Sequence, residues 1–250
     1  MKILLSLFLL LAFSAQAQQS DTLERKPKIE HNLSNPRKIQ SYILPTAFIA
    51  YGLVSLGDNP IRNLDLSTKA ELTEDHPTFA AHVDDYMEFA PMLAMYGLDL
   101  AGVKGKNNVG DQTAMVLITA GITTGIVTAL KNQTHRLRPD GSSYNSFPSG
   151  HTATVFAAAE LLNQEFKGYS PWIGYAGYTV ATATGMLRMY NNKHWLSDVV
   201  AGAGIGIIST KLTYLLYPQL KRLLGGKNHA LSFSPSYQQH QFGYQLSYKL

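Results

Sequence analysis

The sequence predicts an all-α fold, a bundle of about six helices with a functional site at one end. Long apolar segments alternate with short polar ones, and 45% of the residues are hydrophobic while only 15% are charged. The chain has 250 residues, which is enough for one sizeable domain with its own core. It contains no cysteine, so disulfide frameworks, thiol catalysis and cysteine metal sites are excluded.

The charge balance bears on the kind of partner. The formal net charge is +4, which suits an anionic substrate or an anionic membrane surface. The basic residues are scattered and the long segments are apolar, so we expect no nucleic-acid partner.

The N-terminal residues 1–17 are predicted to be a signal peptide. Lys2 supplies the positive start, residues 3–13 form the apolar run, and Ala15-Gln16-Ala17 matches the small-residue cleavage pattern. The alternative is an uncleaved membrane anchor. An exposed lead-in is expected over residues 18–40, a helical domain over 41–225 and a β-like tail over 226–250.

The helical domain is predicted from its apolar segments. Two of them, Gln112–Leu130 and Gly168–Leu187, are free of charge at nearly the length that spans a membrane. The first segment, Tyr42–Gly57, is expected to pack peripherally or at the membrane interface. Residues 61–85 are interpreted as a solvated connection, because their histidines and carboxylates fit no metal-ligand spacing. The remaining apolar segments are Tyr86–Val103, Thr152–Phe166 and Leu196–Tyr217.

The tail has a different pattern. From Phe242 to Leu250, apolar and polar residues alternate, and a similar run begins at Leu231. A period of two is typical of a strand, so the tail predicts a terminal hairpin. The hairpin is interpreted as docked on the domain, with a pairing edge for another protein as the alternative.

The first group of candidate catalytic side chains lies between Arg188 and Asp198. If the chain is helical from Trp195 onward, His194 and Asp198 lie one turn apart on one face. A carboxylate there can hold one imidazole nitrogen and leave the other free to react. We therefore expect Asp198 to orient His194, His194 to attack, and Arg188 to bind an anion.

Two further clusters border apolar segments. Lys131 and Arg138 are cations of the kind that stabilise a phosphoryl group during its transfer. Taken singly, each would more often be a helix-end residue with its head in water. Ser149 and Gly150 precede a helix, where backbone amides can approach an anion. His151 follows them and, paired with His194, is a candidate general acid.

Together these motifs resemble the three-part signature of the type 2 phosphatidic acid phosphatase and vanadium haloperoxidase superfamily. The matching residues are Lys131-x6-Arg138-Pro139, Pro148-Ser149-Gly150-His151 and Arg188-x5-His194-x3-Asp198, in the same order and with the same spacings. The resemblance covers roughly residues 85–217. It implies an all-helical core and metal-independent hydrolysis of phosphate esters, with no cofactor.

The resemblance also assigns roles to single residues. His194 resembles the nucleophile and Asp198 its orienting partner, while His151 resembles the acid that protonates the leaving group and then activates water. The implied phosphate-binding residues are Lys131, Arg138, Ser149, Gly150 and Arg188. One departure is Leu187, because the third motif usually opens with serine before the arginine. We expect a weaker or reshaped phosphate site there. His135 is interpreted as a solvated residue or as one that contacts the site residues without contacting the substrate.

The predicted function is hydrolysis of a phosphate monoester or pyrophosphate on a lipid-type substrate. Candidate substrates are phosphatidic acid, phosphatidylglycerophosphate, polyprenyl pyrophosphate and the phosphates of lipid A. We expect an exported, membrane-associated protein with its site facing the periplasm, and Lys104, Lys106, Lys221 and Arg222 on the cytoplasmic side. The alternatives are a vanadate-dependent haloperoxidase and a non-catalytic envelope scaffold protein.

Overall fold

The computed structural model describes residues 36–76, 79–224, 231–238 and 241–248. These residues form eight helices and two strands. The predicted signal peptide, its cleavage site and most of the lead-in lie outside the described residues.

The fold is all-α apart from the tail, as the apolar segments predict. Eight helices form where about six were expected. They are α2 (Pro36–Val54), α3 (Arg62–Asp75), α4 (Asp84–Met87), α5 (Ala90–Leu100), α6 (Val109–Thr134), α7 (Gly150–Phe166), α8 (Pro171–Tyr190) and α9 (Leu196–Leu224).

The interpretation of residues 61–85 as a solvated connection is wrong. This segment forms α3 and the start of α4, and it buries two carboxylates, Asp65 and Asp84, each with 1% exposure. Both carboxylates pair with arginines of the bundle, which is why the charged segment folds against it. The sequence pattern was polar all round and therefore gave no sign of a buried face.

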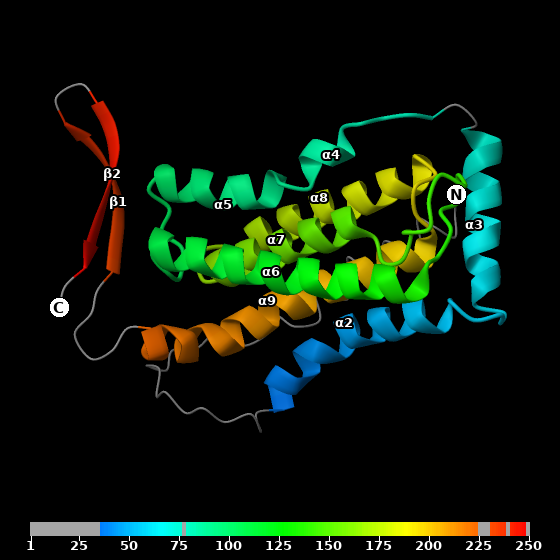
Figure 1. Ribbon diagram of the computed structural model, residues 1–250, viewed down its shortest axis with the longest axis horizontal. Helices are drawn as coiled ribbons and strands as arrows, with labels where there is room; N and C mark the ends of the chain where they lie inside the picture. The colour runs from blue at the N-terminus through cyan, green and yellow to red at the C-terminus, as the bar shows by residue number, and fades with distance from the viewer. Residues whose placement is uncertain (1–35, 77–78, 225–230, 239–240, 249–250) are drawn as a thin grey trace.

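Helices α5 to α9 lie alongside one another, and α3 stands across one end of them (Figure 1). Helix α7 contacts α5, α6, α8 and α9 and forms the middle of the bundle. It carries Val155, Ala159 and Leu162 along one face, all buried. Small residues allow the close packing: an added Cβ at Gly202 of α9 would lie 2.7 Å from the carbonyl oxygen of Ser149.

Helix α2 packs along the outside of α9 (Figure 1). An added Cβ at Gly204 would lie 2.5 Å from the Pro45 carbonyl oxygen, and one at Gly52 would lie 2.5 Å from the Ala201 methyl carbon. The two backbones therefore approach closely at two points one or two turns apart.

Two helices in the described part of the chain are long and apolar enough to cross a membrane by length and composition. They are α6 and residues Leu196–Leu223 of α9. The second helix differs from the expectation, which singled out Gly168–Leu187. That segment lies largely within α8, which is not one of these two helices, whereas α9 is one although it contains Asp198 and Lys211.

The tail forms strands β1 (Leu231–Gln238) and β2 (Gln241–Tyr248). They pair antiparallel, with Leu231 opposite Tyr248 and Gln238 opposite Gln241. Docking of the hairpin on the domain stays a prediction, and a pairing edge for another protein stays its alternative.

Candidate active site

Four helix ends meet at the end of the bundle next to α3. Helices α6 and α8 end there, and α7 and α9 begin there (Figure 1). These ends carry the three sequence motifs, because each motif spans the junction between an apolar helix and the loop beside it. The backbone ties two of the motifs together, since Ser149 N donates to the Asp198 carbonyl oxygen at 3.0 Å.

His194 lies in the loop before α9 and is 3% exposed. Its Nδ1 is 3.6 Å from Asp198 Oδ2, which is within ion-pair distance but longer than a hydrogen bond. Burial lowers the pKa of His194, the attraction of Asp198 opposes this, and the charges of Arg188 and Lys131 add to it, which leaves a pKa of about 4. The ring is therefore neutral at physiological pH, as a nucleophile requires.

Asp198 is fully buried in the first turn of α9, and donors surround its carboxylate. Arg136 Nη1 donates to Oδ1 at 2.7 Å, and the Trp195 amide donates to Oδ2 at 2.9 Å. The Ser146 hydroxyl also donates to Oδ2. These contacts hold the carboxylate in one orientation, with Oδ2 toward His194.

Arg136 was missed as a site residue by the sequence reasoning. Besides Asp198, it contacts Asp65 of α3, with Nη2 2.6 Å from Oδ2. Asp65 in turn accepts from the Ser197 amide at 2.8 Å and from the Ser197 hydroxyl at 2.6 Å. The position of Arg136 between Lys131 and Arg138 was a usable signal, whereas nothing in the sequence around Asp65 pointed to the site.

The three predicted phosphate-binding cations come from two helices and one loop: Lys131 lies in α6, Arg188 in α8 and Arg138 in the loop after α6. Lys131 Nζ donates to the Asn145 carbonyl oxygen at 2.5 Å, and Arg138 Nε donates to the Asn145 side-chain oxygen at 2.9 Å. Burial lowers the pKa of Arg138, and repulsion from Arg188 lowers it further. The cations are thus close enough to repel one another, which favours an anion between them.

Arg188, at the end of α8, is the most buried of these cations, with 7% exposure. Its Nη1 lies 2.6 Å from Asp84 Oδ2 and 3.4 Å from Asp85 Oδ1. Its Nε is buried without a hydrogen-bond partner among the described residues. Asp84 and Asp85 of α4 were not predicted as neighbours of the site.

His151, in the first turn of α7, faces the same acidic residues. Its Nε2 lies 2.9 Å from Asp85 Oδ1 and 4.0 Å from Glu88 Oε1. Burial lowers the pKa of His151, and Arg188 lowers it further, against the opposing effect of Asp85 and Asp84. Asp85 thus lies between the candidate acid and the candidate phosphate-binding arginine.

Ser149 and Gly150 form the entry to α7. Ser149 is fully buried, and its hydroxyl accepts a hydrogen bond from the Thr152 hydroxyl at 2.8 Å. The first helical residue is Gly150, which places the free amides of the helix N-terminus beside His151.

The two remaining residues noted in the sequence lie near this end as well. His135 ends α6 in the left-handed conformation, with φ of 44°, and its side chain is exposed. Leu187 is half-buried in the last turn of α8, beside Arg188. Neither makes a polar side-chain contact with the predicted catalytic residues.

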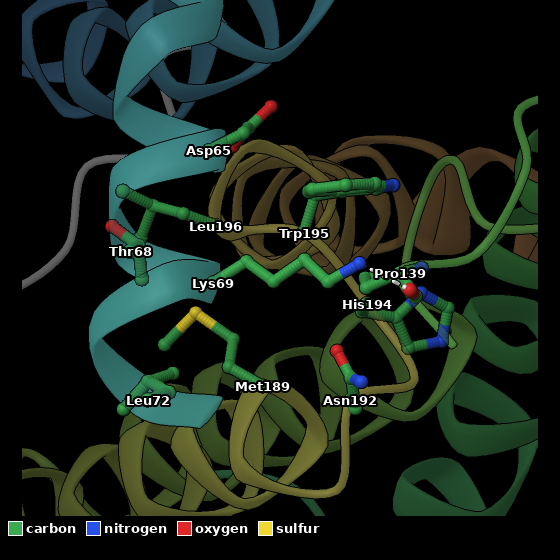
Figure 2. A pocket seen from close by; sticks show the side chains of 10 residues that line it. All are labelled: Asp65, Thr68, Lys69, Leu72, Pro139, Met189, Asn192, His194, Trp195 and Leu196. Atoms are coloured by element: carbon green, nitrogen blue, oxygen red, sulfur yellow. Dashed lines mark hydrogen bonds between the residues drawn. The ribbon is translucent and has the colours of Figure 1, made fainter. Parts of the chain in front are cut away.

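A small pocket reaches His194 from the side of α3 (Figure 2). Lys69 extends from α3 across this pocket and donates to the Pro139 carbonyl oxygen at 2.6 Å. Its Nζ also lies 5.3 Å from the centre of the Trp195 ring. The lining includes Asp65 and His194 but none of the three predicted phosphate-binding cations. In the described part of the chain, no group of three histidine or acidic side chains is arranged to hold a metal ion.

Comparison with known proteins shows what the region around this site is similar to. A sequence model described as the PAP2 superfamily matches residues 112–222, which contain all eight predicted site residues. The lipid A 1-phosphatase of Porphyromonas gingivalis is 40% identical over 161 residues, which cover 62% of this chain and 35% of that protein. The bacitracin transport permease protein BcrC of Bacillus licheniformis is 33% identical over 76 residues, 30% of this chain and 36% of that protein. The chain thus matches about a third of the length of each of these relatives.

Two solved structures are also similar. The crystal structure of Aquifex aeolicus LpxE has a TM-score of 0.45 and 20% identity, covering 58% of this chain and 93% of that one. The transmembrane PAP2-type phosphatidylglycerolphosphate phosphatase of Bacillus subtilis has a TM-score of 0.49 and 19% identity, covering 72% and 98%. The sequence match spans α6 to α9 and includes the three motifs in their expected order. This region of the chain, residues 112–222, therefore matches the PAP2 superfamily.

Proposed function

We propose that this protein is a metal-independent phosphatase that hydrolyses a phosphate monoester or pyrophosphate of a lipid-type substrate through a phosphohistidine intermediate. One observation carries the proposal. A buried, neutral His194 lies against the carboxylate of Asp198, within the field of Arg188 and Lys131. That arrangement supplies a nucleophile, its orienting group and cations for the phosphoryl oxygens.

In the first step, His194 Nε2 attacks phosphorus. A nitrogen–phosphorus bond forms as the bond to the leaving oxygen breaks, and His151 donates a proton to that oxygen. Lys131, Arg138 and Arg188 balance the charge on the non-bridging oxygens, together with the amides at the start of α7. Asp198 faces the ring as it gains positive charge.

In the second step, His151 takes a proton from water and the resulting hydroxide attacks phosphorus. The nitrogen–phosphorus bond breaks, His194 returns to its neutral form, and inorganic phosphate leaves. The same imidazole thus acts as an acid and then as a base, as reversibility of the proton transfer requires.

The substrate is proposed to carry its phosphate on a lipid. The relative that shares 40% identity is a lipid A 1-phosphatase, which makes the 1-phosphate of lipid A the first substrate to test. Large apolar side chains are also exposed on the bundle, including Leu117 of α6 at 68% and Trp172 of α8 at 72%. An apolar surface of this kind suits contact with lipid.

We further propose that the protein is exported and membrane-associated, with its site on the periplasmic side. Helices α6 and α9 supply the apolar length for spanning. The basic residues expected on the cytoplasmic side gather at the opposite end from His194. Lys106 lies over the Tyr214 ring, and Lys221 pairs with Asp111 at the start of α6. In right-side-out vesicles, a membrane-impermeant amine reagent should label Lys193 and spare Lys221. Labelling of Lys221 alone would mean that the protein has the opposite orientation, with the site on the cytoplasmic side.

The function is tested with purified full-length protein in detergent, using lipid A and phosphatidic acid as substrates. We expect phosphate release that persists in excess EDTA, is blocked by orthovanadate and is lost in His194→Ala. A matched control is His135→Asn, which changes an exposed imidazole at the same end and keeps a residue that tolerates the left-handed conformation. It should retain activity.

Two outcomes would overturn the proposal. Activity that is lost to EDTA and restored by zinc or magnesium would contradict the metal-independent mechanism. Halide-dependent bromination by the vanadate-loaded protein, without phosphate release from any lipid, would favour the haloperoxidase alternative. Trapping of acid-labile, alkali-stable phosphate on the wild-type protein, and its absence in His194→Ala, would support the intermediate directly.

A further inference from the structure

Arg136 bridges two buried carboxylates that come from different parts of the chain. Its Nη1 contacts Asp198 Oδ1 at 2.7 Å, and its Nη2 contacts Asp65 Oδ2 at 2.6 Å. The side-chain exposures are 13% for Arg136, 1% for Asp65 and 0% for Asp198. A guanidinium can hold two carboxylates at once because its donors lie in one rigid plane.

The Ser197 side chain locks this bridge. Its hydroxyl accepts from Arg136 Nη1 at 2.7 Å and donates to Asp65 Oδ2 at 2.6 Å. Ser197 directly precedes Asp198, so the network fixes the first turn of α9 as well as the carboxylate. Asp65 belongs to α3, which lies outside the region that matches the family.

The charges of this cluster do not cancel by themselves. Asp65 and Asp198 each carry one negative charge and Arg136 carries one positive charge, which leaves a buried excess of one negative charge. A buried charge of this kind is costly unless a partner neutralises it. The imidazole of His194 faces this excess negative charge. The imidazole ring becomes cationic when it is protonated or phosphorylated.

Other charged groups also act on His194. Arg188 of α8 and Lys131 of α6 oppose a positive charge on its ring, and Asp198 of α9 favours one. Lys69 of α3 lines the pocket beside the ring. Arg136 differs from these groups because it acts through Asp198, whose Oδ1 it occupies while Oδ2 faces His194.

We propose that Arg136, anchored by Asp65, is a positioning residue that holds Asp198 toward His194 and sets how much negative charge His194 faces. The proposal rests on the function proposed above and extends it to α3. Helix α3 thereby helps to orient the nucleophile. The buried excess negative charge is neutralised when the phosphohistidine forms.

The charge count predicts opposite effects for two single substitutions. Arg136→Met leaves two negative charges near His194, which favours its protonation. The acid limb of kcat/KM should then move to higher pH, by about one unit. Asp65→Asn leaves the cluster neutral, which disfavours the cationic ring. Its acid limb should move to lower pH, and kcat should fall.

The double variant Arg136→Met/Asp65→Asn restores the excess of one negative charge. Its acid limb should return close to that of the wild type, although its stability is lower. A residue that mattered only for folding would not produce opposite shifts that cancel. The matched control is Lys211→Met, which breaks another buried ion pair, 3.1 Å long between Lys211 and Glu160, and should leave the limb in place.

The experiment measures phosphate release from phosphatidic acid in detergent micelles as a function of pH, with the full-length protein and each variant. In parallel, ¹³C NMR of ring-labelled histidine follows the titration of His194, whose signal is assigned by its loss in His194→Ala. The NMR titration requires no turnover. If the wild type releases no phosphate from any lipid, the proposed function fails while the inference is still tested.

Two results would overturn the inference. One is a shift of the His194 titration in the same direction in both single variants. The other is a double variant in which the His194 titration shifts as far as in the more strongly shifted single variant, rather than staying near that of the wild type. If Arg136→Met does not fold, Arg136→Lys keeps the charge and loses the two-carboxylate bridge. It should keep the wild-type limb with a lower kcat, and a displaced limb would contradict the charge argument.

Discussion

The Arg188 guanidinium and the Asp84 carboxylate form a buried ion pair, with Nη1 2.6 Å from Oδ2. Asp84 also accepts from the Asn191 side-chain amide at 3.2 Å, and this amide binds the Ala81 carbonyl oxygen at 2.6 Å. The pair therefore joins α4 to the end of α8. Because Nε of Arg188 has no partner among the described residues, a phosphate oxygen can bind there without breaking the pair.

The first prediction follows from this ion pair. Asp84→Ala removes the nearest and only buried counter-charge that Arg188 contacts among the described residues and should lower the free energy of unfolding by about 3 kcal/mol. Orthovanadate, by binding the arginine that has lost its partner, should restore part of the loss. Denaturant unfolding in detergent measures both effects.

The matched control for Asp84 is its neighbour. Asp85→Ala removes a carboxylate that is 49% exposed and lies 3.4 Å from the same guanidinium, so it should cost below about 1 kcal/mol. Equal losses for the two variants would show that burial of the pair does not decide stability here.

The second prediction concerns pH. A nucleophilic imidazole must be neutral, and burial lowers the pKa of His194 from 6.5 to about 4. A lowered pKa keeps the imidazole neutral to lower pH. We therefore expect kcat/KM to stay high as pH falls through 6.5 and to decline only near pH 4. A pH–rate profile on a lipid phosphate measures the limb. A limb near pH 6.5 would mean that His194 is solvated when the enzyme is free.

The third prediction tests the cations that are proposed to bind phosphate. Lys131→Met removes one charge from the group that attracts the phosphoryl oxygens, while keeping a similar apolar length. It should lower kcat/KM by about 10² and weaken inhibition by orthovanadate. Lys193→Met is the control, because Lys193 pairs with Asp140 at 2.7 Å and is not one of the predicted cations. Comparable losses in both variants would remove Lys131 from the site.

The fourth prediction concerns the packing of α9 against the start of α7. An added Cβ at Gly202 would lie 2.7 Å from the Ser149 carbonyl oxygen, so Gly202→Ala should displace Ser149, Gly150 and His151. We expect a loss of at least tenfold in kcat/KM together with a loss of about 2 kcal/mol in stability.

The control for Gly202 is a glycine in α6. Nothing lies within 4 Å of an added Cβ at Gly121, so Gly121→Ala should leave activity unchanged and stabilise the protein by about 0.5 kcal/mol. Circular dichroism melts and phosphate release measure the pair. A harmless Gly202→Ala would show that the two helices can separate without moving the site.

Much of the fold follows from local patterns in the chain. The apolar segments mark α5 to α9 because a buried or lipid-facing helix needs an unbroken apolar surface. Asn108 caps α6 by accepting from the Asp111 amide at 2.9 Å, and Pro171 starts α8. Helix α3 does not follow from such a pattern, since its contacts come from distant segments, among them the ion pair of Asp65 with Arg136, a residue 71 positions away.

The membrane assignment shows a second limit of local patterns. The absence of charge pointed to Gly168–Leu187, but the helix that is long and apolar enough to cross a membrane is α9, despite Asp198 and Lys211. Both charges are compensated inside the bundle, Asp198 by Arg136 and Lys211 by Glu160. A charge count along the sequence cannot distinguish a compensated charge from one that faces lipid.

The sequence by itself determined the all-α class, the three motifs and the residues predicted to perform the chemistry, because spacing along a helix is local. Only the tertiary structure decided which groups surround those residues. It brought Asp65 of α3 to Arg136, and Asp84 and Asp85 of α4 to Arg188 and His151. Ion pairs between distant segments depend on how the helices pack, because packing decides which charges are buried and therefore need a partner. The spacing of residues along the chain does not specify this packing.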